Sequence, residues 1–239
     1  MFFKSITRED FVSWLIKKWK TLLTAFAILV LVAVAVLIWN WQVKQKEYKV
    51  QADLYKLKMS LKDLITEDEN PIDINLINKD QENLVLTENM KTKANSYEQL
   101  LRQNQDIQSS VLFAIDLSDF YYRYGEKQKA KELLSLFSLA LKKHSVYHLA
   151  SFQLASYYMN DKEYEKAFDL FSKLISNKKA SSFHLESRLQ KALCLEAMNQ
   201  SEKALQEYEK IYFENSKDYI GRLAQDYKKL LILKGKSKK

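Results

Sequence analysis

The chain has 239 residues, yet it holds only 3 glycines and 1 proline. Sheet proteins of this length need many turns marked by glycine and proline, whereas helical repeats join their helices through short polar turns. Hydrophobic residues make up 47% of the chain, which argues against wholesale disorder. Together with the scarcity of glycine and proline, this composition predicts an all-α fold. The formal charge is +8, but lysines are interspersed with acidic residues. Without an arginine-rich face and stacking aromatic residues, nucleic-acid binding is not expected.

A short basic segment opens the chain. Residues 1–20 carry five basic and two acidic side chains, a balance of +3. Their apolar residues recur at helical spacing opposite Lys17 and Lys20, at Phe11, Trp14, Leu15 and Trp19. The pattern is typical of a helix that lies in the lipid headgroup layer. The alternative, that this segment simply begins the membrane helix, is equally open.

A run without charged residues follows, over residues 21–41. As a helix it would be about 31 Å long, which matches the hydrocarbon core of a bilayer. Trp19 precedes the run, and Trp39 and Trp41 close it, at the depths where indole rings prefer to lie. A cleavable signal peptide has a shorter apolar stretch and a small-residue cleavage site, and neither is present here. We therefore expect an uncleaved transmembrane signal anchor.

The orientation of this anchor does not follow from charge alone. The twenty residues before it and the twenty after it each hold five basic side chains. Long domains cross the membrane largely regardless of charge, whereas a short basic tail usually stays in the cytoplasm. We expect residues 1–20 to be cytoplasmic and the C-terminal domain to lie on the other side.

Two segments separate the anchor from the main domain. Residues 42–65 carry apolar side chains at helical spacing, which predicts that the membrane helix continues outward. Residues 66–93 contain Pro71 and are rich in Asn, Asp and Glu, so we expect a loop or insertion there. The main domain is then residues 94–239.

An internal repeat organises this domain. Three segments align without gaps on Ala130, Ala167 and Ala204, and both intervals are 37 residues. The positions 12 and 9 residues before each anchor, and 4 and 7 after it, hold residues of the same kind: Ser118, Ala155, Ala192; Tyr121, Tyr158, Leu195; Leu134, Phe171, Tyr208; and Phe137, Leu174, Ile211. Small residues let two antiparallel helices approach closely, while large ones fill the space between hairpins.

The repeat resembles the tetratricopeptide repeat, which predicts an α-solenoid of about three to four helical hairpins. The turn glycine occurs only as Gly125, and Lys191 stands where an aliphatic residue is expected. Ala94–Gln105 fits the second helix of a preceding, degenerate hairpin. Asp218–Leu233 fits a terminal capping helix whose inner face would carry Leu223, Tyr227, Leu230 and Leu231.

Sequence signals of catalysis are missing. Three glycines can hardly build a phosphate-binding loop. His144 and His148 are spaced i, i+4, but no third metal ligand accompanies them, and Cys194 lies in an apolar helical pattern that favours a buried thiol. We expect no catalytic residue, no metal and no cofactor.

A solenoid offers a surface along its first helices, where a partner helix or extended peptide can bind. The tetratricopeptide resemblance implies a groove there, formed by Ile115, Asp119, Tyr122, Arg123, Phe152, Ser156, Met159, Asn160, Leu189, Leu193 and Glu196. The set mixes aromatic and aliphatic residues with polar groups, as binding hot spots do. Several of these side chains could instead pack against neighbouring helices, and the sequence leaves both readings open.

From end to end the chain resembles the ancillary translocon subunits of the YfgM type. The likeness lies in FVSWLIKKWK near the N-terminus, in the apolar run ending in IWNW, and in the stretch from Lys93 to Leu134. It implies a single-pass protein of the bacterial inner membrane with a periplasmic domain that links the SecYEG translocon to periplasmic chaperones.

Two other functions are left open by the sequence. The chain could be a structural scaffold or assembly factor of an envelope or secretion complex, or a subunit that regulates a membrane-bound enzyme. The sequence identifies neither the partner nor the oligomeric state, and a homo-oligomer is compatible with it.

Overall fold

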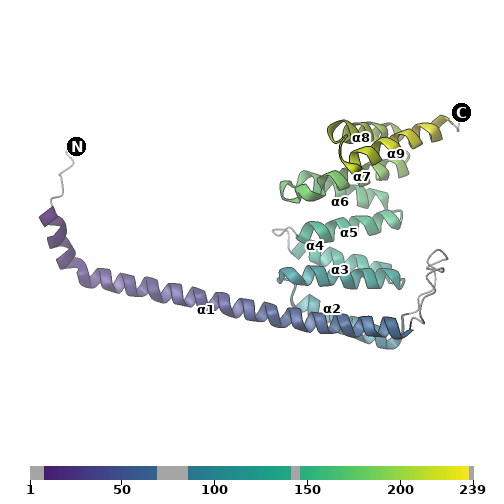
Figure 1. The fold of residues 1–239 in the computed structure, drawn as a ribbon. Coiled ribbons are helices and arrows are strands. Elements are labelled where there is room, and N and C mark those ends of the chain that lie inside the picture. Colours follow the sequence, from purple (N-terminus) through teal and green to yellow (C-terminus); the bar gives the residue numbers. More distant parts are fainter. Residues whose placement is uncertain (1–7, 69–85, 141–145, 237–239) are drawn as a thin grey trace. The chain divides into compact units, whose positions relative to one another are not determined.

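The computed structural model describes residues 8–68, 86–140 and 146–236, which contain helices and no strand (Figure 1). The helices are α1 (Arg8–Asp68), α2 (Glu88–Gln103), α3 (Gln108–Arg123), α4 (Lys127–Ala140), α5 (Val146–Asn160), α6 (Tyr164–Ser176), the short 3-10 helix η2 (Lys178–Ala180), α7 (Ser181–Ala197), α8 (Ser201–Glu214) and α9 (Tyr219–Lys236). The expected all-α fold is confirmed.

The chain divides into two compact units, Met1–Val50 and Gln51–Lys239. The first contains the apolar part of α1, whose described large side chains between Leu23 and Trp41 are exposed. This helix is long and apolar enough to cross a membrane. The helix begins at Arg8, so residues 8–20 and residues 21–41 belong to one helical segment. Residues 1–7 lie outside the described part.

The boundaries around the expected loop differ from the predicted ones. Helix α1 extends to Asp68, and α2 begins at Glu88, six residues before the predicted start of the domain. Thr87 explains this start, because its hydroxyl accepts a hydrogen bond from the backbone N–H of Met90 and thereby caps the helix. The remaining residues, 69–85, lie outside the described part.

Three helical hairpins follow with the predicted 37-residue period: α3 with α4, α5 with α6, and α7 with α8. Each turn places one residue at positive φ, namely Gly125 at 82°, Lys162 at 64° and Asn199 at 60°. The backbone hydrogen bonds also repeat, because the residue after each of these donates to a carbonyl five residues earlier: Glu126 to Tyr121, Glu163 to Tyr158 and Gln200 to Leu195. Different side chains therefore adopt one turn.

The repeated small residues lie where the two helices of each hairpin touch. Ala130, Ala167 and Ala204 are completely buried, as are Ser118, Ala155 and Ala192 on the first helices. The large residues beside them fill the interior, so that Phe137, Phe171 and Tyr208 are also fully buried. Helices can approach this closely only where both carry small side chains. The domain is an α-solenoid of tetratricopeptide-like hairpins.

The end of α1 and helix α2 precede these three hairpins, and we count them together as the first hairpin. Within the second unit, Leu54 and Leu61 of α1 are buried, and Leu61 and Ile65 line a cavity of 150 Å³ together with Tyr97 of α2 and Phe120 of α3. Lys58 forms an ion pair with Asp116 of α3. The segment predicted only to continue the membrane helix therefore also contacts the start of the solenoid.

The last helix, α9, packs against α8 and α7. Ala224 and Leu231 are buried there, and the ring of Tyr227 stacks on Tyr208 with centroids 5.9 Å apart. The prediction that Leu230 lies on the inner face is wrong, since this side chain is 52% exposed. Leu230 and Leu231 are about 100° apart around a helix, so both cannot face the same neighbour.

Candidate functional site

The predicted groove residues lie on the first helices of the three repeating hairpins, α3, α5 and α7. They fall into rows whose members are 37 residues apart: Ile115, Phe152 and Leu189; Asp119, Ser156 and Leu193; Tyr122, Met159 and Glu196; and Arg123 with Asn160. Within each helix the spacing is i, i+4, i+7 and i+8, which places the residues on one side. We call the surface that these rows form the first-helix face.

The first row is largely used by the interior. Leu189 is 2% exposed and packs with Ala192 and Tyr208. The ring of Phe152 contacts two others, Phe171 at 5.5 Å and Phe183 at 5.8 Å between centroids. Ile115 is half-buried. The side chains of this row are therefore mostly buried beneath the first-helix face, and only small parts of them reach the surface.

Polar members of the rows pair with one another or with neighbouring hairpins. The guanidinium of Arg123 lies 2.7 Å from the carboxylate of Asp119 on the same helix. The carboxylate of Glu196 accepts hydrogen bonds from the Tyr208 hydroxyl at 3.2 Å and from the Lys234 ammonium at 2.9 Å. These side chains are held in place before any partner arrives, which lowers the entropic cost of binding.

The remaining residues offer side chains that are less committed. Asn160 is exposed at the end of α5, and Ser156, Met159 and Leu193 are half-buried. Two further leucines, which the sequence analysis did not single out, lie on the same side of their helices, three residues before the first row. Leu112 is 50% exposed and Leu149 is 36% exposed. Their 37-residue separation and helical spacing are the signals that would have found them.

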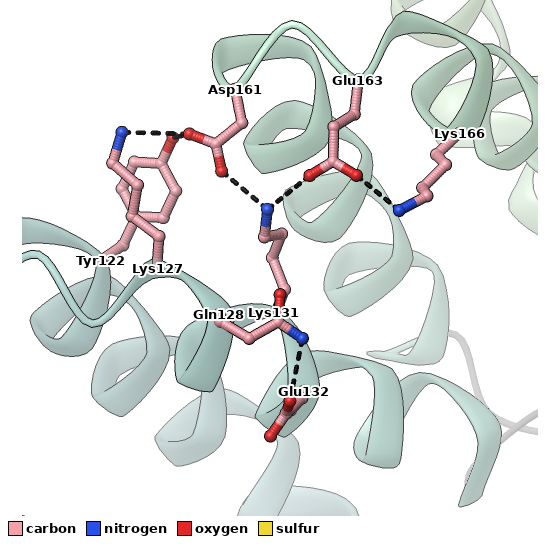
Figure 2. A network of polar contacts seen from close by, with 8 residues as sticks. All are labelled: Tyr122, Lys127, Gln128, Lys131, Glu132, Asp161, Glu163 and Lys166. Carbon is pink, nitrogen blue, oxygen red and sulfur yellow. Dashed lines mark hydrogen bonds and ion pairs between the residues drawn. The ribbon is translucent and has the colours of Figure 1, made fainter.

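A polar network fixes the edge of this face between the second and third hairpins (Figure 2). The nearly buried ammonium of Lys131, on α4, donates to Asp161 Oδ2 at 2.8 Å and to Glu163 Oε1 at 2.6 Å in the turn between α5 and α6. On the other oxygen of Asp161, the Tyr122 hydroxyl donates at 2.8 Å and the Lys127 ammonium at 3.1 Å. Tyr122 is thereby removed from the freely available residues of the face.

Stacking reinforces the same junction. The ring of Tyr122 lies parallel to that of Tyr157, with centroids 4.2 Å apart and planes inclined by 9°. Tyr157 itself is buried in α5. The C-terminal end of α3 is therefore locked to α5 by one stacked pair and one hydrogen-bonded carboxylate.

The electrostatics of the network follow from its geometry. Partial burial opposes ionisation of Asp161, but hydrogen bonds from Lys131, Tyr122 and Lys127 outweigh it and lower the pKa of the carboxyl. Burial likewise opposes charge on Lys131, yet its two carboxylate partners raise the pKa of the ammonium. Asp161 and Lys131 are therefore both charged at neutral pH and paired with each other.

The next junction is built differently. At 37 residues beyond Lys131, Asp161 and Glu163 stand Phe168, Met198 and Gln200. An open hollow of about 580 Å³ lies there, lined by Glu165, Phe168, Asp169, Lys191, Leu195, Met198, Gln200, Lys203, Gln206 and Glu207. Its charges have both signs, and Lys191 already pairs with Glu207 at 3.3 Å. Nothing in it converges on a defined ligand.

Chemically reactive groups do not gather in the described residues. No three metal-ligating side chains cluster among them. His148 is buried without a hydrogen-bond partner, and His144 lies outside the described part. Cys194 is a buried free thiol, as its apolar setting in the sequence predicts, and burial raises its pKa to about 11.

Comparison with known proteins adds little to this geometry. The chain matches no protein-family model and no curated protein. Similar solved structures include two crystal structures of a candidate kinesin light chain from Podosopora anserina with nearly identical TPR-like repeats. Their identities are 18% and 17%, each match covers 62% of this chain and 81% of the other, and the TM-score is 0.47. The fold assignment therefore stands on the hairpins described above.

Proposed function

We propose that this protein is a membrane-anchored adaptor that binds other proteins through its first-helix face. The observation that carries the proposal is the set of half-exposed and exposed apolar side chains repeated on successive first helices, among them Leu112, Leu149 and Met159. Polar contacts hold the surrounding side chains in one arrangement, as the Asp119–Arg123 pair shows. Fixed apolar anchors with a polar border are typical of protein-binding surfaces.

The anchor is the apolar part of α1, which we place across the bilayer with the basic N-terminal segment in the cytoplasm and the solenoid outside. Attachment at a membrane keeps the first-helix face at high effective concentration near membrane-bound partners. By the resemblance of the sequence, we propose the periplasmic side of a bacterial inner membrane, with the SecYEG translocon and periplasmic chaperones as the partners. The function needs neither catalysis nor a cofactor.

Site-specific photocrosslinking in the native cell tests this proposal. We would introduce a photoreactive amino acid at Asn160, which is exposed, and at Met159, which is half-buried; both are on the first-helix face. The matched control is the exposed Glu209 on the second helix α8. We expect adducts from the first two positions and none from Glu209.

The identity of the adducts decides between partners. Translocon subunits or chaperones outside the cytoplasm support the adaptor and its orientation together. Adducts of one fixed assembly that do not change when protein export is blocked would replace the translocon link with a structural scaffold. If Glu209 yields the same adducts as Asn160, the first-helix face is not the binding surface.

A further inference from the structure

The last helix carries a stripe of side chains that is largely exposed, although Leu223 within it packs in part against the core. On α9, Tyr219 is 68% exposed, Leu230 52% and Leu233 61%, while Leu223 is half-buried. With Asp226 these residues follow one another at intervals of 4, 3, 4 and 3, so they form a single stripe along the helix.

The repeat period shows which side of α9 this stripe occupies. A shift of 37 residues takes Leu193 to Leu230 and Glu196 to Leu233, so the stripe continues two rows of the first-helix face. The ammonium of Lys234 reaches Glu196 across the two helices at 2.9 Å, which joins the rows physically. The binding surface thus extends one helix beyond the three hairpins.

The same shift excludes one occupant, a second helix completing a hairpin with α9. In the other hairpins the second helix approaches a small residue, Ser118, Ala155 or Ala192. The residue 37 positions beyond Ala192 is Lys229, whose long charged side chain prevents that close approach. The exposed leucines therefore point to a ligand on the first-helix face.

The spacing and the charges define this ligand. Intervals of 4 and 3 are those of a coiled-coil seam, which accepts another helix. Tyr219–Lys236 carries five basic residues and one acidic residue, a net charge of +4, and Arg222 and Lys229 flank the stripe on one side. Acidic residues beside the apolar seam of the ligand would complement this flank.

Charge also argues against two other occupants. A second copy of α9 would bring the same basic flank against itself, because Arg222 and Lys229 would face their own counterparts. A bilayer would have to take up Asp226, whose side chain lies within the stripe, is 63% exposed and pairs only with Lys229 at 3.3 Å. A helix ligand can instead place a basic residue opposite this carboxylate.

We propose that α9 binds an amphipathic helix of a partner protein whose leucine-rich seam is flanked by acidic residues. The site deepens the proposed function, because it extends the first-helix face and specifies one kind of partner for it. Its ligand is recognised by the exposed leucines and by the basic flank together.

A designed peptide tests the site on the full-length protein. The probe is a fluorescent three-heptad peptide with leucine at the seam positions and glutamate at the flanking ones, and the comparison peptide carries lysine at those flanks. With the protein in zwitterionic lipid nanodiscs, fluorescence anisotropy should show saturable binding of the glutamate peptide and a weaker response to the lysine peptide. Leu230→Asp should weaken binding by about tenfold or more.

Two further variants keep the test sharp. Phe213 is 86% exposed on the second helix α8, outside the first-helix face, so Phe213→Asp should leave the affinity unchanged. Arg222→Glu combined with Lys229→Glu leaves the leucines in place and should reverse the preference between the two peptides. Circular dichroism of each variant reports whether the helices are retained.

The proposal is overturned if neither peptide binds, if Phe213→Asp weakens binding as much as Leu230→Asp, or if the double charge variant keeps the original preference. If a dye attached to the cysteine of Leu233→Cys inserted into anionic lipid, the occupant of the stripe would be the membrane surface and not a partner helix. If two copies of the Leu230→Cys variant formed a disulfide with each other, the occupant of the stripe would be a second copy of the chain. Crosslinks from Asn160 that persist in Leu230→Asp would show that the proposed function stands even where this site fails.

Discussion

At the scale of single residues, the three hairpin turns show how one backbone shape accommodates different side chains. Each turn needs a residue at positive φ, which glycine adopts at no steric cost and asparagine tolerates. Gly125 and Asn199 meet this requirement, whereas Lys162 carries a side chain that disfavours it. The strained backbone at Lys162 is held in place by the residues on either side of it, because Asp161 and Glu163 accept hydrogen bonds from Lys131 in the polar network.

Replacement of Lys162 by glycine should therefore stabilise the protein. We expect Lys162→Gly to raise the free energy of unfolding by about 0.5–1 kcal/mol, since glycine relieves the steric cost of positive φ. Gly125→Ala should lower it by about 1 kcal/mol for the same reason. Urea unfolding of the full-length protein in nanodiscs, followed by circular dichroism, measures both. A loss of stability in Lys162→Gly would contradict this account of the turn.

At the scale of elements, the hairpins are joined by contacts that do not repeat. The second and third hairpins are linked by Lys131 with Asp161 and Glu163, while the residues 37 positions further on are Phe168, Met198 and Gln200. The helices repeat because their local pattern repeats, yet each junction has its own chemistry. This difference lets one solenoid present both polar and apolar regions.

Removal of the central lysine should loosen that junction. Lys131→Met leaves two carboxylates near each other without their buried cation, and we expect it to lower the free energy of unfolding by about 1–3 kcal/mol. Lys166→Met is the matched control, because the exposed ammonium of Lys166 contacts Glu163 and the ring of Tyr158 at the surface, and its loss should leave stability nearly unchanged. Equal effects of the two variants would contradict the central role of Lys131.

The pH dependence of this junction has a defined sign. The pKa of Asp161 is lowered in the folded state, so its contribution is complete above the ordinary carboxyl pKa of 3.8 and is lost as pH falls through the folded-state value. Unfolding measured between pH 7 and pH 3 should therefore show a smaller loss of stability in Asp161→Asn than in the unmodified protein. Parallel curves would contradict the assignment.

The junction of α8 and α9 depends on a close backbone approach. A Cβ atom on Gly221 would lie 1.8 Å from the carbonyl oxygen of Asn215, which forces the backbone to move. We expect Gly221→Ala to lower the free energy of unfolding by about 2 kcal/mol or more and to expose α9 to proteolysis. Gly235→Ala is the matched control in the same helix, since nothing lies within 4 Å of its added Cβ, and should be neutral or stabilising. Equal proteolysis of the two variants would contradict the contact.

At the scale of the whole molecule, stability is shared between stacked hairpins, because each buries its apolar faces only against its neighbours. Cys194 reports on this stacking. It belongs to α7 and packs with Phe171 and Ala167 of the preceding hairpin. Its thiol can react only when the two hairpins separate.

Cys194 should accordingly be inert in the folded protein. Burial blocks access and raises its pKa to about 11, so hardly any thiolate forms at pH 7. We expect a thiol reagent to label Cys194 slowly in the native protein and at once in the urea-unfolded protein. The Lys131→Met variant should be labelled at a rate close to that of the native protein if the second and third hairpins open independently of the fourth. Rapid labelling of the native protein would contradict the packing of α7.

The sequence by itself determined the all-α class, the 37-residue hairpins and the apolar helix, because these depend on periodicities that are complete within short segments. It also predicted a buried Cys194, since an apolar helical pattern surrounds this residue. Only the tertiary structure decided which groove residues are consumed by packing, as Leu189 and Tyr122 are, and that Leu230 faces outward. It also decided that the end of α1 lines a cavity together with α2 and α3. The physical reason is that each of these outcomes depends on contacts between helices far apart in the chain, which a local pattern does not encode.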